Sequence, residues 1–191
     1  LKKDQIPFDD NIEIGTMIET PAATLCIDNI LEHVDFVSIG TNDLIQYTLA
    51  VDRINENVAH LYQPFHPSVI RSLKQIFVAA NKAEKKVSIC GELGGDPMAT
   101  MLLLGLGKLE DLSMEPHSIP KVKKIIRLIR LDEARQMADH VLSFNSVEKI
   151  SLFIAEEMRT RFPDDFDRDL SFQKKTKPGW RPIPSGRILK N

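Results

Sequence analysis

The fold is decided by residues 34–43, Val34-Asp35-Phe36-Val37-Ser38-Ile39-Gly40-Thr41-Asn42-Asp43. The first part of this stretch is a short apolar run typical of a buried strand, and the second part is small and polar. Further short apolar runs occupy residues 12–18, 87–90 and 109–114, and each is followed by a helix-start signal. Strands that alternate with helices in this way indicate βα units, so the sequence predicts an α/β fold with a parallel sheet.

The predicted helices are recognised mainly by their first residues. Thr20-Pro21, His66-Pro67 and Asp96-Pro97 each place a capping residue before a proline, which is favoured at the first helical position. The helix that begins after His66 also carries apolar residues at helical spacing. In full, helices are predicted at residues 21–33, from 67 through at least 80, and at 97–105, 119–130, 132–142 and 146–162.

The end of the chain differs from the rest. Residues 163–191 have Asp-rich and Lys-rich patches, several Pro and Gly residues and no periodicity. We therefore predict one domain at residues 1–162 and an extended or disordered tail at residues 163–191.

Composition and charge exclude several classes of protein. The chain has 191 residues, 42% hydrophobic and 27% charged, and a formal net charge of −2. That charge gives no electrostatic reason to expect binding to nucleic acid or to an anionic membrane. No apolar run is long enough to span a membrane, and residues 1–5 lack the apolar core of a signal peptide. The two cysteines, Cys26 and Cys90, form no disulfide or zinc pattern, so we expect a cytoplasmic protein.

Polar side chains follow the predicted strands where each strand ends. Glu19 follows the first strand, Asn42 and Asp43 follow the second, and Cys90 ends the third. The carboxyl ends of parallel strands meet at one edge of a sheet, which is where chemistry collects in such folds. Glu19 could merely complement a helix dipole and Asp43 could cap a segment, but two carboxylates on adjacent strand ends suit Mg²⁺.

Cys90 and Arg53 each have a structural and a functional interpretation. A cysteine is usually a small buried hydrophobe, and Cys26 is predicted to be one, within a helix. Cys90, however, lies in a glycine-rich stretch where backbone can approach a ligand, and a neutral thiol can donate a proton. Arg53 could form a surface ion pair with Asp52, or it could bind a phosphate or carboxylate.

Residues 40–53 closely resemble the signature of the phosphoenolpyruvate-utilising enzyme family. The resemblance continues through Leu61-Tyr62-Gln63-Pro64 and His66-Pro67, and through residues 90–97 and 112–120. Within that family the chain is most similar to the enzyme I type of the bacterial phosphotransferase system or its nitrogen-related paralogue. Pyruvate phosphate dikinase and phosphoenolpyruvate synthase are more distant.

The resemblance implies specific roles for the strand-end residues. Glu19 and Asp43 would hold Mg²⁺, Asn42, Asp43 and Arg53 would bind phosphoenolpyruvate, and Cys90 would be the proton donor. The implied reaction transfers a phosphoryl group from phosphoenolpyruvate to a histidine and releases pyruvate. An HPr-like phosphocarrier protein would be a partner through other domains, a homodimer is expected, and the setting would be sugar transport or nitrogen regulation.

The family fold is a (β/α)8 barrel, and the matched motifs belong to its second half. Four βα units leave open sheet edges, and the family's Gly-Gly-x-x-Ser-His motif for the phosphorylated histidine is absent from this sequence. We therefore expect half of a TIM barrel with C-terminal helices, which would be inactive alone and would pair with another half-barrel or cover its edges with the tail. The alternatives are a non-catalytic dimerisation or regulatory module, or part of a dikinase or synthase.

Overall fold

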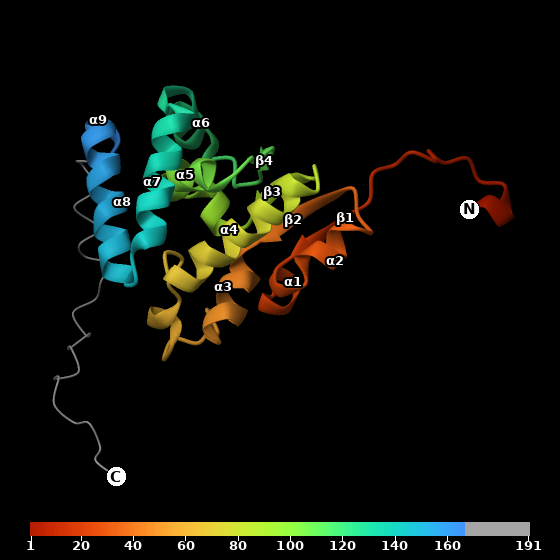
Figure 1. The fold of residues 1–191 in the computed structure, drawn as a ribbon, viewed down its shortest axis with the longest axis horizontal. Coiled ribbons are helices and arrows are strands. Elements are labelled where there is room, and N and C mark those ends of the chain that lie inside the picture. The colour runs from red at the N-terminus through yellow and green to blue at the C-terminus, as the bar shows by residue number, and fades with distance from the viewer. Residues whose placement is uncertain (167–191) are drawn as a thin grey trace, which may run out of the picture. The chain divides into compact units, whose positions relative to one another are not determined.

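The computed structural model describes residues 1–166, and a parallel sheet is its centre (Figure 1). The strands are β1 (Gly15–Ile18), β2 (Phe36–Gly40), β3 (Lys86–Cys90) and β4 (Asp111–Leu112). They lie in the order β1-β2-β3-β4 and all pairings are parallel. The predicted α/β class with a parallel sheet is confirmed. In the described residues β1 and β4 are the sheet edges, so closure into a barrel stays a prediction.

The helices largely follow the predicted starts. α4 begins at Pro67 and α5 at Pro97, and the side chains of His66 and Asp96 cap them by accepting the N–H of Ser68 and Met98. The other helices agree with the prediction to within a few residues, except at residues 21–33, 41–49 and 163–166. The bounds are α1 (Pro21–Leu25), α2 (Ile27–Leu31), α3 (Thr41–Leu49), α4 (Pro67–Lys82), α5 (Pro97–Leu106), α6 (Ile119–Leu128), α7 (Leu131–Ser143), α8 (Val147–Arg161) and α9 (Pro163–Phe166), with short 3-10 turns η1 (Lys2–Asp4), η2 (Ala59–Leu61) and η3 (Glu92–Gly95).

The first difference is a break in the helix predicted at residues 21–33. Cys26 separates α1 from α2 with a non-helical conformation, φ −100° and ψ 19°. Its side chain is exposed, so the prediction that Cys26 belongs to the core was wrong. The break turns Leu25 outward as well, 75% exposed, while Ile27 is buried. The prediction treated residues 21–33 as one continuous helix with a single buried face, and that face included Cys26.

The second difference is α3, a helix that directly follows β2 and that the sequence did not predict. From the sequence, Asp43 is considered only as a possible cap and Asn42 as a possible turn residue, beside their functional interpretation. Gly40 precedes the helix and has no side chain to cap it, so the usual start signal is absent. The first turn of α3 is instead held by hydrogen bonds to residues at the end of β3, which are described below.

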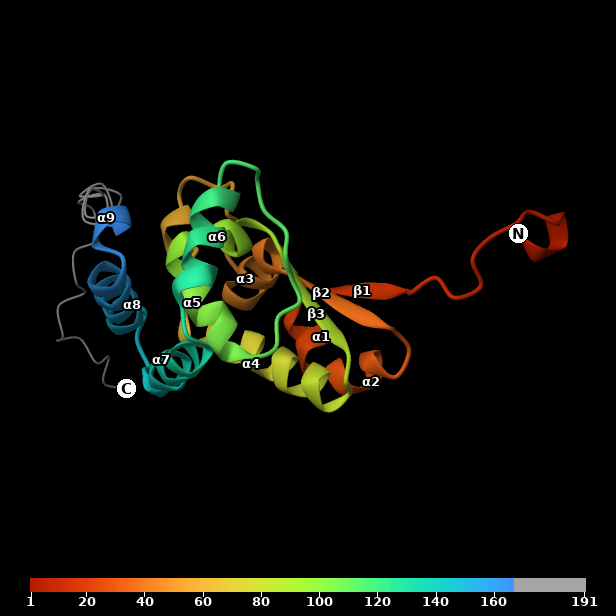
Figure 2. The same ribbon diagram turned by 90° about the horizontal axis from the view of Figure 1, so that it is seen from above.

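The two faces of the sheet are covered by the rest of the chain to different extents. Ile18, Ile39 and Ile89 lie in register on one face and are fully buried. Helices α1, α2 and α4 gather on one side of the strands in both ribbon views (Figures 1 and 2). The neighbouring register position carries Met17, 48% exposed, beside Ser38, which is half-buried. Because side chains alternate along a strand, Met17 and Ser38 lie on the opposite face of the sheet. Within the described residues, this second face is the less covered of the two.

The chain divides into two compact units, the first comprising Leu1–Ala155 and the second beginning at Glu156, within α8. Of the tail predicted at residues 163–191, the structure describes residues 163–166, which form α9 rather than an extended segment. The rest of that prediction lies outside the described residues. None of the helices in residues 1–166 is long and apolar enough to cross a membrane.

Candidate functional site

A pocket of about 580 Å³ lies at the carboxyl ends of β2, β3 and β4. The sequence predicts functional side chains at this edge, and two of the predicted residues, Asn42 and Arg53, line the pocket. The loop after β4, which follows the predicted fourth strand end, supplies the opposite side. The lining residues are Asn42, Arg53, Gly91, Glu92, Gly95, Ser113, Met114, Glu115, His117 and Ser118.

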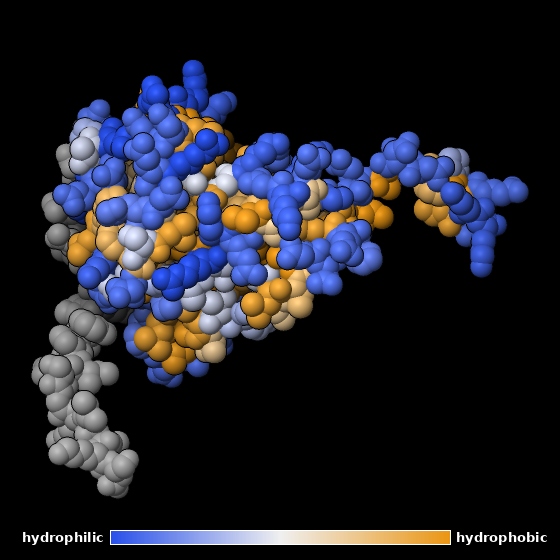
Figure 3. All heavy atoms as spheres, viewed as in Figure 1, coloured by the Kyte–Doolittle hydropathy of each residue, from blue (hydrophilic) through white to orange (hydrophobic). Residues whose placement is uncertain are grey.

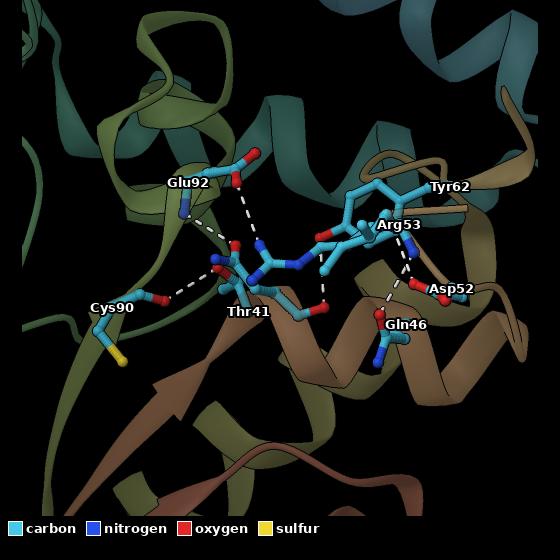
Figure 4. A network of polar contacts seen from close by, with 9 residues as sticks. Thr41, Gln46, Asp52, Arg53, Tyr62, Cys90 and Glu92 are labelled. Carbon is cyan, nitrogen blue, oxygen red and sulfur yellow. Dashed lines mark hydrogen bonds and ion pairs between the residues drawn. The ribbon is translucent and has the colours of Figure 1, made fainter. Parts of the chain in front are cut away.

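The start of α3 is bound to the end of β3 by two hydrogen bonds (Figure 4). The Thr41 hydroxyl donates to the Cys90 carbonyl at 2.9 Å, and the Glu92 N–H donates to Asn42 Oδ1 at 3.0 Å. Gly91 lies between these bonds with a φ of 103°, a conformation that residues with a side chain rarely adopt. An added Cβ at Gly91 would lie 2.9 Å from Asn42 Oδ1. The segment Cys90–Glu92 is therefore fitted closely against the first turn of α3.

Arg53 and Glu92, which both line the pocket, form an ion pair. Arg53 Nη1 donates to Glu92 Oε1 at 3.1 Å, and its backbone N–H donates to Gln46 Oε1 at 3.3 Å (Figure 4). Asp52, the ion-pair partner considered from the sequence, instead accepts the Ile54 N–H at 2.9 Å. The alternative in which Arg53 merely pairs with its neighbour on the surface was therefore wrong, and its guanidinium faces the pocket.

The outer side of the segment that carries Arg53 is apolar. Tyr47, Ile54 and Leu61 expose 56%, 82% and 49% of their surface. Figure 3 shows apolar surface over α3 and the segment that follows it. This segment turns apolar side chains outward while Arg53 points inward.

The two predicted metal ligands lie on adjacent strand ends. Glu19 follows β1 and packs over Gly40 at the end of β2, where an added Cβ would be 2.7 Å from Glu19 Oε2. Asp43 is half-buried in the first turn of α3, three residues after Gly40 in the chain. Their hard oxygen donors suit Mg²⁺, which takes one or two protein carboxylates and completes its shell with water and phosphate oxygens. In the described part of the chain, no three His, Cys, Asp or Glu side chains form a complete metal-binding group.

Cys90 is half-buried, and its thiol faces β2. The thiol donates to the Ile39 carbonyl at 3.4 Å and accepts a hydrogen bond from the Ser38 hydroxyl at 3.5 Å. A sulfur that receives a hydroxyl hydrogen bond has a donor in place to stabilise negative charge after the thiol loses its proton. Cys90 is not a disulfide partner, which leaves its thiol available for chemistry.

Tyr62 joins this network, although its role was not predicted beyond its place in the family signature. Its hydroxyl donates to the Asn42 carbonyl at 3.3 Å (Figure 4). Burial raises the pKa of Tyr62 to about 12, with the nearby Glu92 and Asp43 carboxylates adding to the rise and Arg53 opposing it. The site therefore holds a neutral phenol among charged groups.

The raised pKa of Tyr62 gives a spectroscopic prediction. Because the folded pKa of about 12 exceeds the ordinary tyrosine pKa of 10.0, folding favours the protonated phenol. The stabilisation that comes from this preference should be complete below pH 10 and should disappear as pH rises towards 12. The chain has two tyrosines, so a phenolate absorbance titration of the native chain minus that of Tyr62→Phe isolates Tyr62. A difference curve centred near the ordinary tyrosine pKa of 10.0 would contradict the buried position of Tyr62 beside two carboxylates.

The structure thus brings some of the predicted residues to one pocket and places others beside it. Asn42 and Arg53 line the pocket, whereas Glu19, Asp43 and Cys90 lie at the same strand ends but outside its lining. Reasoning from the sequence missed the pairing role of Glu92. It also missed the contribution of residues 113–118 as a pocket wall, for which the only signal was their place after a predicted strand.

Comparisons with known proteins show the family of the chain. Residues 1–131 match the family model described as PEP-utilising enzyme, PEP-binding domain. A phosphoenolpyruvate-protein phosphotransferase of Buchnera aphidicola subsp. Schizaphis graminum is 49% identical over 150 residues, which cover 78% of this chain and 26% of that protein. The Haemophilus influenzae protein of the same name is 48% identical over 149 residues, covering 78% of this chain and 26% of that protein.

A third relative is similar at a lower identity. The protein of the same name from Geobacillus stearothermophilus is 44% identical over 145 residues, covering 76% of this chain and 25% of its own length. The chain therefore spans about a quarter of the length of the curated relatives it matches.

Proposed function

The chain belongs to the PEP-utilising enzymes through their PEP-binding domain, and we propose that it supplies the magnesium- and phosphoenolpyruvate-binding strand ends of a phosphotransferase. The observation that carries the proposal is the arrangement at one sheet edge. The Asn42 amide comes from the first turn of α3, the Arg53 guanidinium from the segment after α3 and the Cys90 thiol from the end of β3, and two carboxylates flank them. These groups could bind an anion, hold a metal ion and donate a proton, which are the three roles that an anionic, metal-dependent substrate requires.

Asn42 and Arg53 are proposed to bind the substrate. Asn42 Oδ1 already accepts the Glu92 N–H, so the amide NH₂ of Asn42 is the end left to donate to a phosphate or carboxylate oxygen. Arg53 uses Nη1 for Glu92, which leaves its other guanidinium N–H groups for a ligand. Both residues therefore present donors to the pocket, as an anionic substrate requires.

Glu19 and Asp43 are proposed to hold Mg²⁺ together with oxygens of the substrate. A bound magnesium ion would neutralise charge on the phosphate and on the developing enolate. Gly40 allows this arrangement because it leaves the space above the end of β2 to the Glu19 carboxylate.

Cys90 is proposed to protonate the enolate of pyruvate that remains after phosphoryl transfer. The thiol proton moves to carbon 3 as the enolate π electrons form the new C–H bond, the C–O⁻ group becomes a carbonyl, and sulfur keeps the negative charge. The Ser38 hydroxyl, 3.5 Å from Sγ, is the donor placed to stabilise that thiolate.

The remaining proposals concern a whole protein and rest on the family resemblance. They are transfer of the phosphoryl group to a histidine outside this chain, an HPr-like phosphocarrier as partner, a cytoplasmic homodimer, and a place in sugar transport. The curated relatives are named phosphoenolpyruvate-protein phosphotransferases, which favours this type over a dikinase or a synthase. A purely non-catalytic module would have no need for the Arg53 and Asn42 donors in a pocket.

The proposal predicts magnesium-dependent binding of phosphoenolpyruvate that is lost when Arg53 is removed. Charge-assisted hydrogen bonds of this kind contribute enough that Arg53→Ala should weaken binding by about 10- to 100-fold. Calorimetric titration should be carried out on the chain itself and on a chimera, defined as the Haemophilus influenzae relative with its matched segment replaced by this chain. Arg71→Ala, which removes an exposed arginine of α4, is the control.

If neither the chain nor the chimera bound phosphoenolpyruvate with Mg²⁺, the proposed function would be wrong. Equal effects of Arg53→Ala and Arg71→Ala would show that binding does not occur in this pocket.

A further inference from the structure

Both partners of the Arg53–Glu92 ion pair are held in place by α3. At the start of the helix, Asn42 Oδ1 accepts the Glu92 N–H at 3.0 Å. In the middle, Gln46 Oε1 accepts the Arg53 N–H at 3.3 Å. The two side chains then meet at 3.1 Å, although they are 39 residues apart in the chain. The ion pair is thus positioned through backbone contacts on both sides.

This ion pair mainly fixes where the Arg53 and Glu92 side chains lie and does little to stabilise the fold. The Glu92 side chain is 77% exposed and that of Arg53 35%, and such pairs add little to the free energy of folding. Glu92 nevertheless places a negative charge in the lining of the pocket that is proposed to bind an anion. It also occupies one end of the guanidinium on which that anion would depend.

The repulsion between Glu92 and a ligand grows with the negative charge of the ligand. Free phosphoenolpyruvate carries its full phosphate and carboxylate charge, whereas a bound divalent cation cancels two of these negative charges. A carboxylate in the pocket therefore penalises the metal-free ligand more than the metal-loaded one. Removing the carboxylate should reduce this difference.

We propose that Glu92 is a specificity-determining residue that makes the pocket select metal-loaded over metal-free phosphoenolpyruvate, by holding Arg53 and opposing the uncompensated anion. This inference rests on the proposed function, since it concerns the same ligand in the same pocket. Glu92 restricts when Arg53 engages the substrate: the cation must be present to offset the carboxylate.

The test compares two substitutions that each remove one negative charge near Arg53. Glu92→Gln keeps an oxygen that can accept from Arg53 but removes the charge. Asp52→Asn is the matched control, because Asp52 is next to Arg53 in the chain but accepts the Ile54 N–H instead of the guanidinium. Phosphoenolpyruvate should be titrated calorimetrically into each protein, the chain and the chimera, once with Mg²⁺ and once with a chelator.

For Glu92→Gln we expect metal-free binding to strengthen by about tenfold and binding with Mg²⁺ by about twofold, so the dependence on magnesium falls by about fivefold. Asp52→Asn should leave that dependence unchanged. Weaker binding of Glu92→Gln under both conditions would overturn the proposal, because Glu92 would then only orient Arg53. Unchanged affinities, or equal changes in both variants, would overturn it as well. Failure of the unsubstituted proteins to bind with Mg²⁺ would instead count against the proposed function.

Discussion

Replacing Cys90 by Ala should slow protonation of the pyruvate enolate by about 10²- to 10⁴-fold, the usual contribution of a general acid. The reason is that the Cys90 thiol is the group proposed to donate this proton, and it lies between the Ser38 hydroxyl and the Ile39 carbonyl. Binding should not change in the same way, because Asn42, Arg53, Glu19 and Asp43 are all retained.

The two effects can be measured separately. Exchange of the pyruvate methyl protons in heavy water, followed by NMR with the chimera and Mg²⁺, reports proton transfer at carbon. Titration with oxalate, a planar dianion that resembles the enolate, reports binding. Cys26→Ser is the control, since Cys26 is exposed between α1 and α2. If Cys90→Ala kept normal exchange, the thiol would not be the proton donor.

Replacing Gly91 by Ala should destabilise the chain by about 2–4 kcal/mol, a large effect for one methyl group. The backbone of Gly91 has a φ of 103°, in which a side chain is strained, and the added Cβ would lie 2.5 Å from Thr41 Oγ1. Relief of this contact requires moving Thr41 or Asn42, and with it the hydrogen bonds that hold Cys90 and Glu92. The site should therefore lose phosphoenolpyruvate binding together with stability.

Gly95→Ala provides the comparison in the same glycine-rich segment. Gly95 lines the pocket without a positive φ, and its added Cβ would approach Met114 Cβ at 3.0 Å. Urea denaturation should show the midpoint of Gly91→Ala well below that of Gly95→Ala at an unchanged slope. A smaller loss for Gly91→Ala than for Gly95→Ala would refute the close fit of residues 90–92 against α3.

The sequence predicted those parts of the fold that local chemistry determines. A polar residue before proline marked the first residues of α1, α4 and α5, because an N-cap side chain and a proline each act on the adjacent turn. α3 was missed because Gly40 offers no cap, and the contacts that hold its first turn come from Cys90 and Glu92, about 50 residues later. Contacts of this range cannot be inferred from a local pattern.

The same limit applies to the site. The strand ends placed Glu19, Asn42, Asp43 and Cys90 at one edge because parallel strands end together. The pairing of Arg53 with Glu92, rather than with the adjacent Asp52, depends on the course of the chain after α3. That course is set by Ala50, whose φ of 52° ends the helix and turns the chain back towards Gln46. An alanine carries no evident signal for such a turn.

The central claim is that Glu19 and Asp43 at adjacent strand ends hold the cation that accompanies phosphoenolpyruvate. Mn²⁺ prefers the same carboxylate and water ligands as Mg²⁺ and broadens the NMR signals of nearby nuclei. The most direct measurement is therefore the amide spectrum of the isotope-labelled chain, and of the chimera, with phosphoenolpyruvate and substoichiometric Mn²⁺. We expect selective broadening around residues 19–20 and 40–43 that Asp43→Asn abolishes. Broadening centred instead on Glu115 and His117, or unaffected by Asp43→Asn, would contradict the account.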